Sequence, residues 1–222
     1  HRDIKPHNIM LTGPEDSPEV KVMDFGIAKD MTIKDGQTFS GTTLGTLHYM
    51  APEQFEDART IDNRADVYSL GVLLYELLTG ATPFDSTKLL EAGYAEIQRI
   101  IRDVDPPSPS TQLSSTDQDS ATIAVKRATN PKNLVQIVRG DLDVIVMKSL
   151  EKDRSRRYDS PTDFASDVQR FLKHEPIVAR SPSAAYRLKR LYERNRVTFV
   201  ATSIVIASLL VGSVTSAIMA IK

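Results

Sequence analysis

The 222 residues are enough for one or two ordinary domains. The formal net charge of −1 gives no electrostatic reason to expect nucleic-acid binding, and the lack of cysteine excludes disulfides and thiolate metal sites. The chain starts with His rather than Met, inside a polar motif, so we expect it to be a piece of a longer protein.

Two polar motifs near the start of the chain carry groups suited to phosphoryl transfer. HRDIKPHN occupies residues 1–8, and DFG follows from Asp24. Transfer of a phosphoryl group from a magnesium nucleotide to a hydroxyl needs a carboxylate that orients the hydroxyl and takes its proton. It also needs a cation beside the moving group and oxygen ligands for the metal. We assign these roles to Asp3, to Lys5, and to the pair Asn8 and Asp24, in that order.

The stretch between the two motifs predicts a hairpin. Residues 8–11 and 20–23 read as short strands, separated by a polar turn at 13–18. Such a hairpin brings Asn8 and Asp24 near each other, as two ligands of one divalent ion must be. Metal coordination is therefore expected from the hairpin geometry itself.

HRDIKPHN followed by DFG resembles the catalytic loop and metal-binding motif of protein kinases. The resemblance covers about residues 1–173 and implies an α+β, protein-kinase-like fold. The chain would hold the mostly helical C-terminal lobe, without the small lobe. The resemblance further implies ATP with Mg²⁺ or Mn²⁺, protein substrates, and structural or regulatory roles for His1, Arg2, Phe25 and Gly26.

A loop-rich segment of thirty residues runs from Asp24 to Glu53. It ends in GTLHYMAPE, at 45–53, which resembles the substrate-binding end of the activation segment in Ser/Thr kinases. Within that resemblance, Lys5 and Thr46 favour serine or threonine over tyrosine as the acceptor.

Arg2 directly precedes Asp3, as in kinases whose arginine pairs with a phosphorylated residue of the activation loop. A phosphate adds about −1.5 to −2 charges and can order a loop through such a pair. The candidate phosphosites are Thr38, Ser40 and Thr42; the alternative is that they are ordinary polar loop residues.

The strongest soluble helix is expected over residues 62–80, where leucines recur at spacings of three and four and other apolar residues widen the face. A helix that is apolar on most sides belongs in the middle of a domain. It resembles the central helix of the kinase large lobe, in which Asp66 would hold the backbone of the turn at His1 and Arg2.

The basic stretch DRSRRY at 153–158 resembles the kinase segment whose arginine pairs with the glutamate of the Ala-Pro-Glu motif. Alignment on Tyr158 makes Arg157 the partner of Glu53, with the neighbouring Arg156 as the alternative.

Other parts of the kinase domain, placed at 1–174, are less regular. Helices are expected at 88–102, 141–152 and about 160–173. The Pro-, Ser- and Thr-rich residues 104–140 predict an exposed and partly disordered insertion.

The composition changes after Pro176. Residues 175–196 form a basic linker whose cations are opposed mainly by Glu193: Arg180, Arg187, Lys189, Arg190, Arg194 and Arg196. Residues 197–221 are 25 consecutive uncharged residues, whereas a bilayer core needs about 20. We expect one transmembrane helix in the inner or plasma membrane, and the basic cluster predicts a cytoplasmic kinase domain.

Four small residues of this apolar segment recur every four positions: Ser208, Gly212, Ser216 and Ala220. Small residues at this spacing let two membrane helices approach closely, which suggests a homodimer. The alternative is chance, because such residues are common in membrane helices.

The order of kinase domain, basic linker and single membrane helix resembles bacterial eukaryotic-type receptor kinases. The stretches at 140–158 and 181–196 are similar to membrane kinases of planctomycete-like bacteria. The implied function is transfer of the ATP γ-phosphoryl group to Ser or Thr hydroxyls of proteins in membrane-anchored signalling. Because the sequence contains no glycine-rich loop, strand lysine or helix glutamate of the small lobe, we expect this chain alone to fold poorly and to be inactive.

Two other functions remain as alternatives. A pseudokinase scaffold would keep the fold without catalysis, but such proteins commonly lose Asp3, Asn8 or Asp24, and all three are present. A small-molecule phosphotransferase shares a related catalytic loop, but lacks the combination of Arg2 and Lys5 and the GTLHYMAPE segment.

Overall fold

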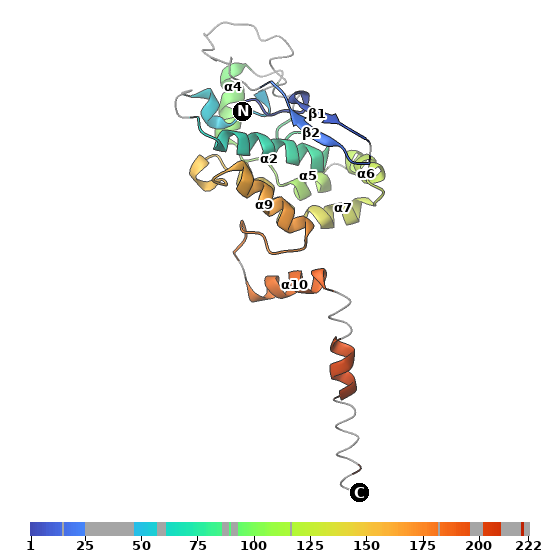
Figure 1. Cartoon of the computed structure of the whole chain (residues 1–222). Helices are drawn as coiled ribbons and strands as arrows, with labels where there is room; N and C mark the ends of the chain where they lie inside the picture. The colour runs from blue at the N-terminus through green and yellow to red at the C-terminus, as the bar shows by residue number, and fades with distance from the viewer. Residues whose placement is uncertain are drawn as a thin grey trace. The chain divides into compact units, whose positions relative to one another are not determined.

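The computed structural model divides the chain into two compact units, His1–Val168 and Gln169–Lys222, which are described separately (Figure 1). The described residues are 1–14, 16–24, 47–56, 61–85, 89, 93–115, 117–181, 183–195, 202–209 and 219, except for the side chains of 117–120.

The chain begins with the catalytic-loop motif and the predicted hairpin. A short 3-10 helix, η1 (Pro6–Asn8), leads into strands β1 (Ile9–Thr12) and β2 (Glu19–Val22), which pair antiparallel (Figure 1). The Met23 N–H donates to the Asn8 carbonyl at 2.8 Å. This hydrogen bond extends the strand pairing by one position, to the end of the hairpin where the HRDIKPHN and DFG motifs lie next to each other.

Helix α2 (Arg64–Thr79) is the predicted central helix, and Gly80 ends it in the left-handed conformation at φ 76°. Its most buried large side chains are Val67, Tyr68, Val72 and Tyr75, rather than the leucines that dominate the sequence pattern. Leu77 is 61% exposed. The helix is therefore central, but its deepest face is aromatic and β-branched.

The main core lies between α2 and α8 (Asp141–Ser149), which pack against each other. Gly71 allows this approach, because a Cβ at that position would lie 2.0 Å from Ser149 Oγ. The buried cluster comprises Tyr49, Ala51, Ala65, Tyr68, Val72, Tyr75, Val146 and Leu150. The end of the activation segment is thus part of this core.

A second cluster joins the same segment to α4 (Tyr94–Asp103), which contacts the 3-10 helix η2 (Pro52–Phe55). Its buried members are Leu47, Met50, Leu89, Ile97 and Ile101. Both clusters support residues 47–55, so hydrophobic burial fixes this segment from two sides.

The prediction of an exposed and partly disordered insertion at 104–140 is wrong. Three helices lie there: α5 (Pro109–Ser115), α6 (Asp117–Lys126) and α7 (Pro131–Val138). Their buried apolar side chains are no more than 3% exposed: Leu113, Ala124, Leu134 and Val138. Each helix is short and buries only a few such residues against its neighbours, so the local sequence gives little sign of the packing. One local signal was present, since Asn130 caps α7 and proline follows it.

Helices α9 (Pro161–Leu172) and α10 (Ala184–Arg194) follow. No helix in the described part of the chain is both long and apolar enough to cross a bilayer. Of the predicted membrane segment at 197–221, the structure describes only residues 202–209, which are helical, and 219. The remainder, with Gly212, Ser216 and Ala220, lies outside the described residues.

Candidate active site

The catalytic-loop residues form a compact polar cluster around the Asp3 carboxylate. The Asn8 side-chain N–H group donates to Asp3 Oδ2 at 2.9 Å and to the Asp3 carbonyl at 2.7 Å. Lys5 Nζ lies 3.2 Å from the same Asp3 Oδ2. Two donors from the same loop therefore fix the orientation of this carboxylate.

The two expected metal ligands lie at one end of the hairpin. Asn8 pairs through its backbone with Met23, and Asp24 is the next residue, in the left-handed conformation at φ 54°. Because the Asn8 amide nitrogen is engaged by Asp3, its orientation is settled and its oxygen is available as a ligand. An amide oxygen and a carboxylate suit Mg²⁺, which takes few protein ligands and keeps waters and phosphate oxygens. Elsewhere, the described residues contain no group of three or more His, Cys, Asp or Glu side chains that could hold a metal ion.

Asp66 on α2 holds the backbone of the catalytic loop. Its carboxylate accepts hydrogen bonds from the Arg2 backbone N–H at 2.7 Å and from the backbone nitrogen of His1 at 2.8 Å. Arg2 has a positive φ of 66°, which is costly for a residue with a side chain, so this turn needs such external support. The tether predicted from the sequence is present in the structure.

The His1 imidazole connects the loop to the second motif. Its Nε2 lies 3.0 Å from the Met23 carbonyl, which can only accept, so Nε2 carries the proton. Its Nδ1 can then accept from the Asp3 N–H at 3.4 Å. The ring thus links the backbone of the catalytic aspartate to the residue before Asp24.

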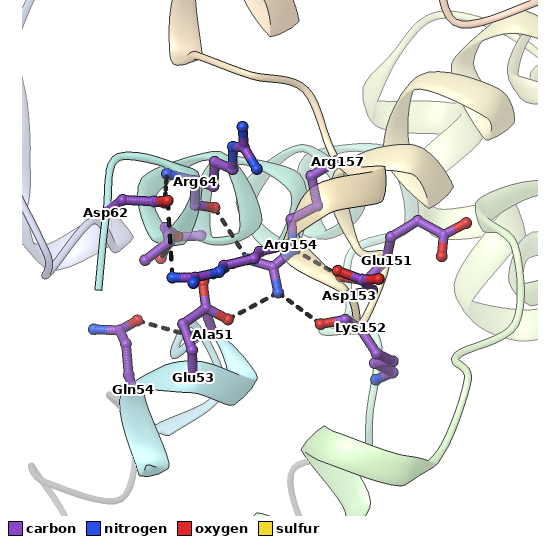
Figure 2. A network of polar contacts seen from close by, with 12 residues as sticks. Ala51, Glu53, Gln54, Asp62, Arg64, Glu151, Lys152, Asp153, Arg154 and Arg157 are labelled. Carbon is purple, nitrogen blue, oxygen red and sulfur yellow. Dashed lines mark hydrogen bonds and ion pairs between the residues drawn. The ribbon is translucent and has the colours of Figure 1, made fainter. Parts of the chain in front are cut away.

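Glu53 and Arg157 form a buried ion pair in which two guanidinium nitrogens face two carboxylate oxygens, at 2.7 and 2.9 Å (Figure 2). Arg157 also donates to the backbone carbonyls of Arg64, Glu151 and Lys152. The geometry selects Arg157 over its neighbour.

The alternative partner, Arg156, has a side chain that is 68% exposed and lies 3.2 Å from Glu151. The guanidinium of Arg157 also lies over the Tyr68 ring, 5.0 Å from its centre. Burial raises the pKa of the Tyr68 hydroxyl, against the opposing effect of the Arg157 charge.

Several contacts around the activation-segment end were not anticipated from sequence. The Gln54 side chain donates to the Arg2 carbonyl at 3.1 Å and accepts from the Ala51 N–H at 2.9 Å, linking this segment to the catalytic loop. Tyr49 donates from its hydroxyl to Glu76 on α2. Burial lowers the pKa of His48, against the opposing effect of Glu76. The contacts of Gln54 with Arg2 and of Tyr49 with Glu76 have no local sequence signal, because the partners are 52 and 27 positions apart.

Six predicted site residues lie outside the described residues: Phe25, Gly26, Thr38, Ser40, Thr42 and Thr46. Asp3, Lys5, Asn8 and Asp24 are all described, and they come together at the loop and the adjoining end of the hairpin.

An oriented carboxylate, a lysine beside it and two oxygen-bearing side chains at one end of a short hairpin are the arrangement of a phosphotransferase-type catalytic loop, carried by a mostly helical fold. The model of the protein kinase domain matches residues 1–175. The chain belongs to the protein kinase family.

The chain is also similar to several bacterial kinases. It is 33% identical over 186 residues to a probable serine/threonine-protein kinase of Clostridium perfringens, covering 83% of this chain and 22% of that protein. It is 35% identical over 176 residues to serine/threonine-protein kinase PknB of Mycobacterium leprae, covering 79% and 23%. It is 35% identical over 182 residues to serine/threonine-protein kinase Pkn1 of Myxococcus xanthus, covering 81% and 22%. The chain thus spans less than a quarter of the length of these relatives.

Proposed function

We propose that the protein is a serine/threonine protein kinase that transfers the γ-phosphoryl group of ATP to Ser or Thr hydroxyls of protein substrates. The observation that carries this proposal is the Asp3 carboxylate, held by Asn8 at 2.9 Å and by Lys5 at 3.2 Å. Three residues whose chemistry phosphoryl transfer requires are in mutual contact, on the loop that the family uses for it.

In the proposed reaction, Asp3 accepts a hydrogen bond from the substrate hydroxyl and takes its proton as the oxygen attacks phosphorus. A new bond forms between that oxygen and the γ-phosphorus, and the bond from the γ-phosphorus to the bridging oxygen of ADP breaks. Lys5 supplies a positive charge close to Asp3 and to the transferring group.

Asn8 and Asp24 would hold Mg²⁺, or Mn²⁺, through the amide oxygen and the carboxylate. The bound ion would neutralise charge on the nucleotide phosphates and help to orient them. Support for this assignment comes from the hairpin, which fixes both residues at one end, and from the hydrogen bonds that engage the amide nitrogen of Asn8 with Asp3.

The preference for Ser or Thr is supported by Lys5 and by the names of the relatives, which are serine/threonine-protein kinases. Thr46 would contribute to the same preference in the substrate-binding segment. Regulation would involve phosphorylation at Thr38, Ser40 or Thr42, with the exposed Arg2 as the partner of the phosphate.

The experiment that tests the activity is phosphotransfer from labelled ATP by the full-length protein, its Asp3→Asn variant and a control variant, Asp103→Asn. Asp103 is also an aspartate, but it is partly exposed and lies on α4. We expect label on Ser and Thr from the wild type and the control, and a loss of label in Asp3→Asn. If the folded wild type binds ATP but transfers nothing, the protein is a pseudokinase scaffold instead. Label on a small molecule but on no protein would identify a small-molecule phosphotransferase.

We also propose that the protein is anchored in the inner or plasma membrane by residues 197–221, with the kinase domain in the cytoplasm, as in the planctomycete-like kinases that it resembles. The segment has 25 consecutive uncharged residues. Its described part is helical, and the large apolar side chains there are more than half exposed: Ile204, Val205, Ile206 and Leu209.

Two measurements test the anchor. We expect the protein to stay with membranes during alkaline carbonate extraction, and a reporter fused after Lys222 to be active only outside the cytoplasm. Substitution of Gly212 by Leu would weaken self-association if the small-residue face mediates a homodimer. A reporter that is active only in the cytoplasm would overturn the orientation.

A further inference from the structure

Helix α10 exposes an apolar face. Leu188 is 56% exposed, and Leu191 and Tyr192 are each 43% exposed. Residues three and four apart lie next to each other on a helix surface, so these three side chains form one continuous apolar stripe, called here the α10 stripe.

The opposite face of α10 is polar. This polar face is covered by other residues of the same unit, Gln169–Lys222. The Tyr186 hydroxyl accepts from the Ile177 N–H at 3.1 Å. Arg190 bonds Glu193 at 2.7 Å, and its guanidinium lies 5.8 Å from the centre of the Phe171 ring. A helix on the surface of a soluble protein buries its apolar face and exposes its polar one, and α10 does the reverse.

Cations flank the α10 stripe on both sides. On the helix surface, Arg187 and Arg194 lie along one edge of the stripe and Lys189 lies along the other. The Lys189 side chain is 72% exposed and lies 3.8 Å from Glu193, and that of Arg194 is 48% exposed and lies 3.8 Å from Glu175. Glu193, the acidic residue of the helix, lies on the covered face.

We propose that α10 lies in the plane of an anionic bilayer surface, with the α10 stripe inserted at the level of the headgroups and Arg187, Lys189 and Arg194 against lipid phosphates. A helix with a basic polar face and Leu or aromatic residues on the other binds membrane surfaces in this way. The proposal rests on the membrane anchor proposed above, because the uncharged run from 197 starts three residues after Arg194 and would hold α10 at the bilayer.

The charge pattern favours lipid over a second copy of the chain as the occupant. Packing two α10 stripes against each other would bring the flanking cations of both helices together, and the nearest acidic partners of Lys189 and Arg194, Glu193 and Glu175, lie at a long 3.8 Å. An anionic bilayer supplies apolar depth and negative charge over one surface.

The absence of tryptophan from the whole sequence makes a site-specific test possible. Leu188→Trp places the only tryptophan of these 222 residues in the α10 stripe, and Tyr192→Trp provides a second position in it; any tryptophan outside these residues is replaced by phenylalanine in every variant. Leu77→Trp is the matched control, because Leu77 is a similarly exposed leucine, 61%, on α2 of the kinase domain. Each variant is reconstituted in nanodiscs of phosphatidylcholine alone or of phosphatidylcholine with phosphatidylglycerol.

We expect the emission of Leu188→Trp and Tyr192→Trp to shift to shorter wavelength with the anionic lipid, and to be quenched by lipids brominated on their acyl chains, while Leu77→Trp does neither. Interfacial helices bury their apolar face by about 5–10 Å, within reach of brominated chains. Adding Arg187→Gln and Lys189→Gln to Leu188→Trp should reduce the shift, and high salt should do the same, because salt screens exposed charges.

Emission that is equal in the two lipids and unquenched by the brominated chains would overturn the proposal. So would a short-wavelength shift that depends on protein concentration in detergent without lipid, which would assign the α10 stripe to a second copy. Carbonate extraction of the same samples reports on the anchor separately. A retained protein with unshifted tryptophan therefore refutes the surface helix alone, and an extracted protein refutes the anchor.

Discussion

Arg157 and Glu53 are 104 positions apart in sequence and form a two-point ion pair in the protein interior, with N–O distances of 2.7 and 2.9 Å. The Arg157 side chain is fully buried, and three backbone carbonyls accept its remaining donors. Five hydrogen bonds match the five N–H donors of a guanidinium, so this arginine is fully satisfied despite its burial. The pair ties the end of the activation segment to the segment after α8.

We predict that Arg157→Met lowers the free energy of unfolding by about 3–5 kcal/mol, because the Glu53 carboxylate would be left buried without a partner. Arg157→Lys should also destabilise, since a lysine cannot reproduce the planar two-point contact. The measurement is urea denaturation of the full-length protein followed by circular dichroism.

The matched control is Arg156→Met, whose exposed side chain should matter by no more than about 0.5 kcal/mol. Equal losses in the two methionine variants would show that general charge, rather than the buried pair, carries the stability.

The second prediction concerns Asp66, which accepts the two backbone donors at the start of the catalytic loop. Asp66→Ala should lower kcat by about 10²-fold, since a catalytic group misplaced by about 1 Å loses that much. The unfolding cost should be only about 1.5–3 kcal/mol, the contribution of a hydrogen bond to a charged group, because the donors are exposed or half-buried. Steady-state phosphotransfer by the full-length protein measures the first effect and chemical denaturation the second.

Asp103→Asn, partly exposed on α4, serves as the control for Asp66 and should leave kcat unchanged. A fully active Asp66→Ala variant would mean that the positive φ of Arg2 is maintained by other contacts.

The third prediction is a pH dependence that arises from Lys152. Burial lowers the pKa of this lysine from 10.5 to about 8, an effect that Asp105 opposes. Its ammonium donates to the Ile101 carbonyl at 2.7 Å and lies 4.9 Å from the centre of the Phe84 ring. Between pH 8 and 10.5 the unfolded chain binds more protons at this residue than the folded protein does. The contribution of Lys152 to the free energy of unfolding therefore rises with pH in that window and is lost as the pH falls through about 8.

Lys152→Met keeps the contact with Phe84 and removes the titration. The difference in unfolding free energy between wild type and variant should shift in favour of the wild type from pH 7.5 to pH 9.5, a range chosen from the pKa values above. A difference that is constant across these pH values would refute the burial of this ammonium.

The fourth prediction tests the close packing of α2 on α8. Gly71→Ala should destabilise by about 1–3 kcal/mol, because its Cβ would overlap Ser149 Oγ at 2.0 Å and Ser149 Cβ at 2.8 Å. Combining it with Ser149→Ala should recover part of the loss, since the nearest atom is then absent. Thermal or urea unfolding of the wild type and of the single and double variants gives the free energies for a double-mutant cycle, which measures the coupling between the two residues.

Gly93→Ala is the control for Gly71→Ala, because no heavy atom lies within 4 Å of the Cβ it would gain and its φ is −67°. It should be neutral to within about 0.5 kcal/mol, because the entropy gain from alanine is opposed by the loss of glycine as the N-cap residue of α4. If both alanine variants are equally stable, α2 and α8 are less closely packed than described.

The sequence alone determined the parts whose signals are local. The hairpin follows from two short alternating runs around a polar turn, and α2 follows from an apolar pattern with Gly80 at its end. The central helix was predicted at 62–80 and lies at 64–79. Residues close in sequence, such as Asp3 and Asn8, must also be close in space, so their contact needed little tertiary information.

Resemblance to a family supplied two long-range contacts that local patterns could not give. Asp66 reaches the backbone of Arg2, and Arg157 reaches Glu53 rather than leaving that place to Arg156. The structure decides between the two arginines by burial, since only one of the two side chains points into the interior.

Only the tertiary structure revealed α5, α6 and α7, because each is short and is stabilised by burial of a few side chains against neighbouring helices. It also decided that α2 buries Tyr68 and Tyr75 more deeply than Leu77, and that α10 turns its apolar stripe outward. A sequence pattern shows that a helix has two faces, but which face is covered depends on the partners that the rest of the fold brings to it.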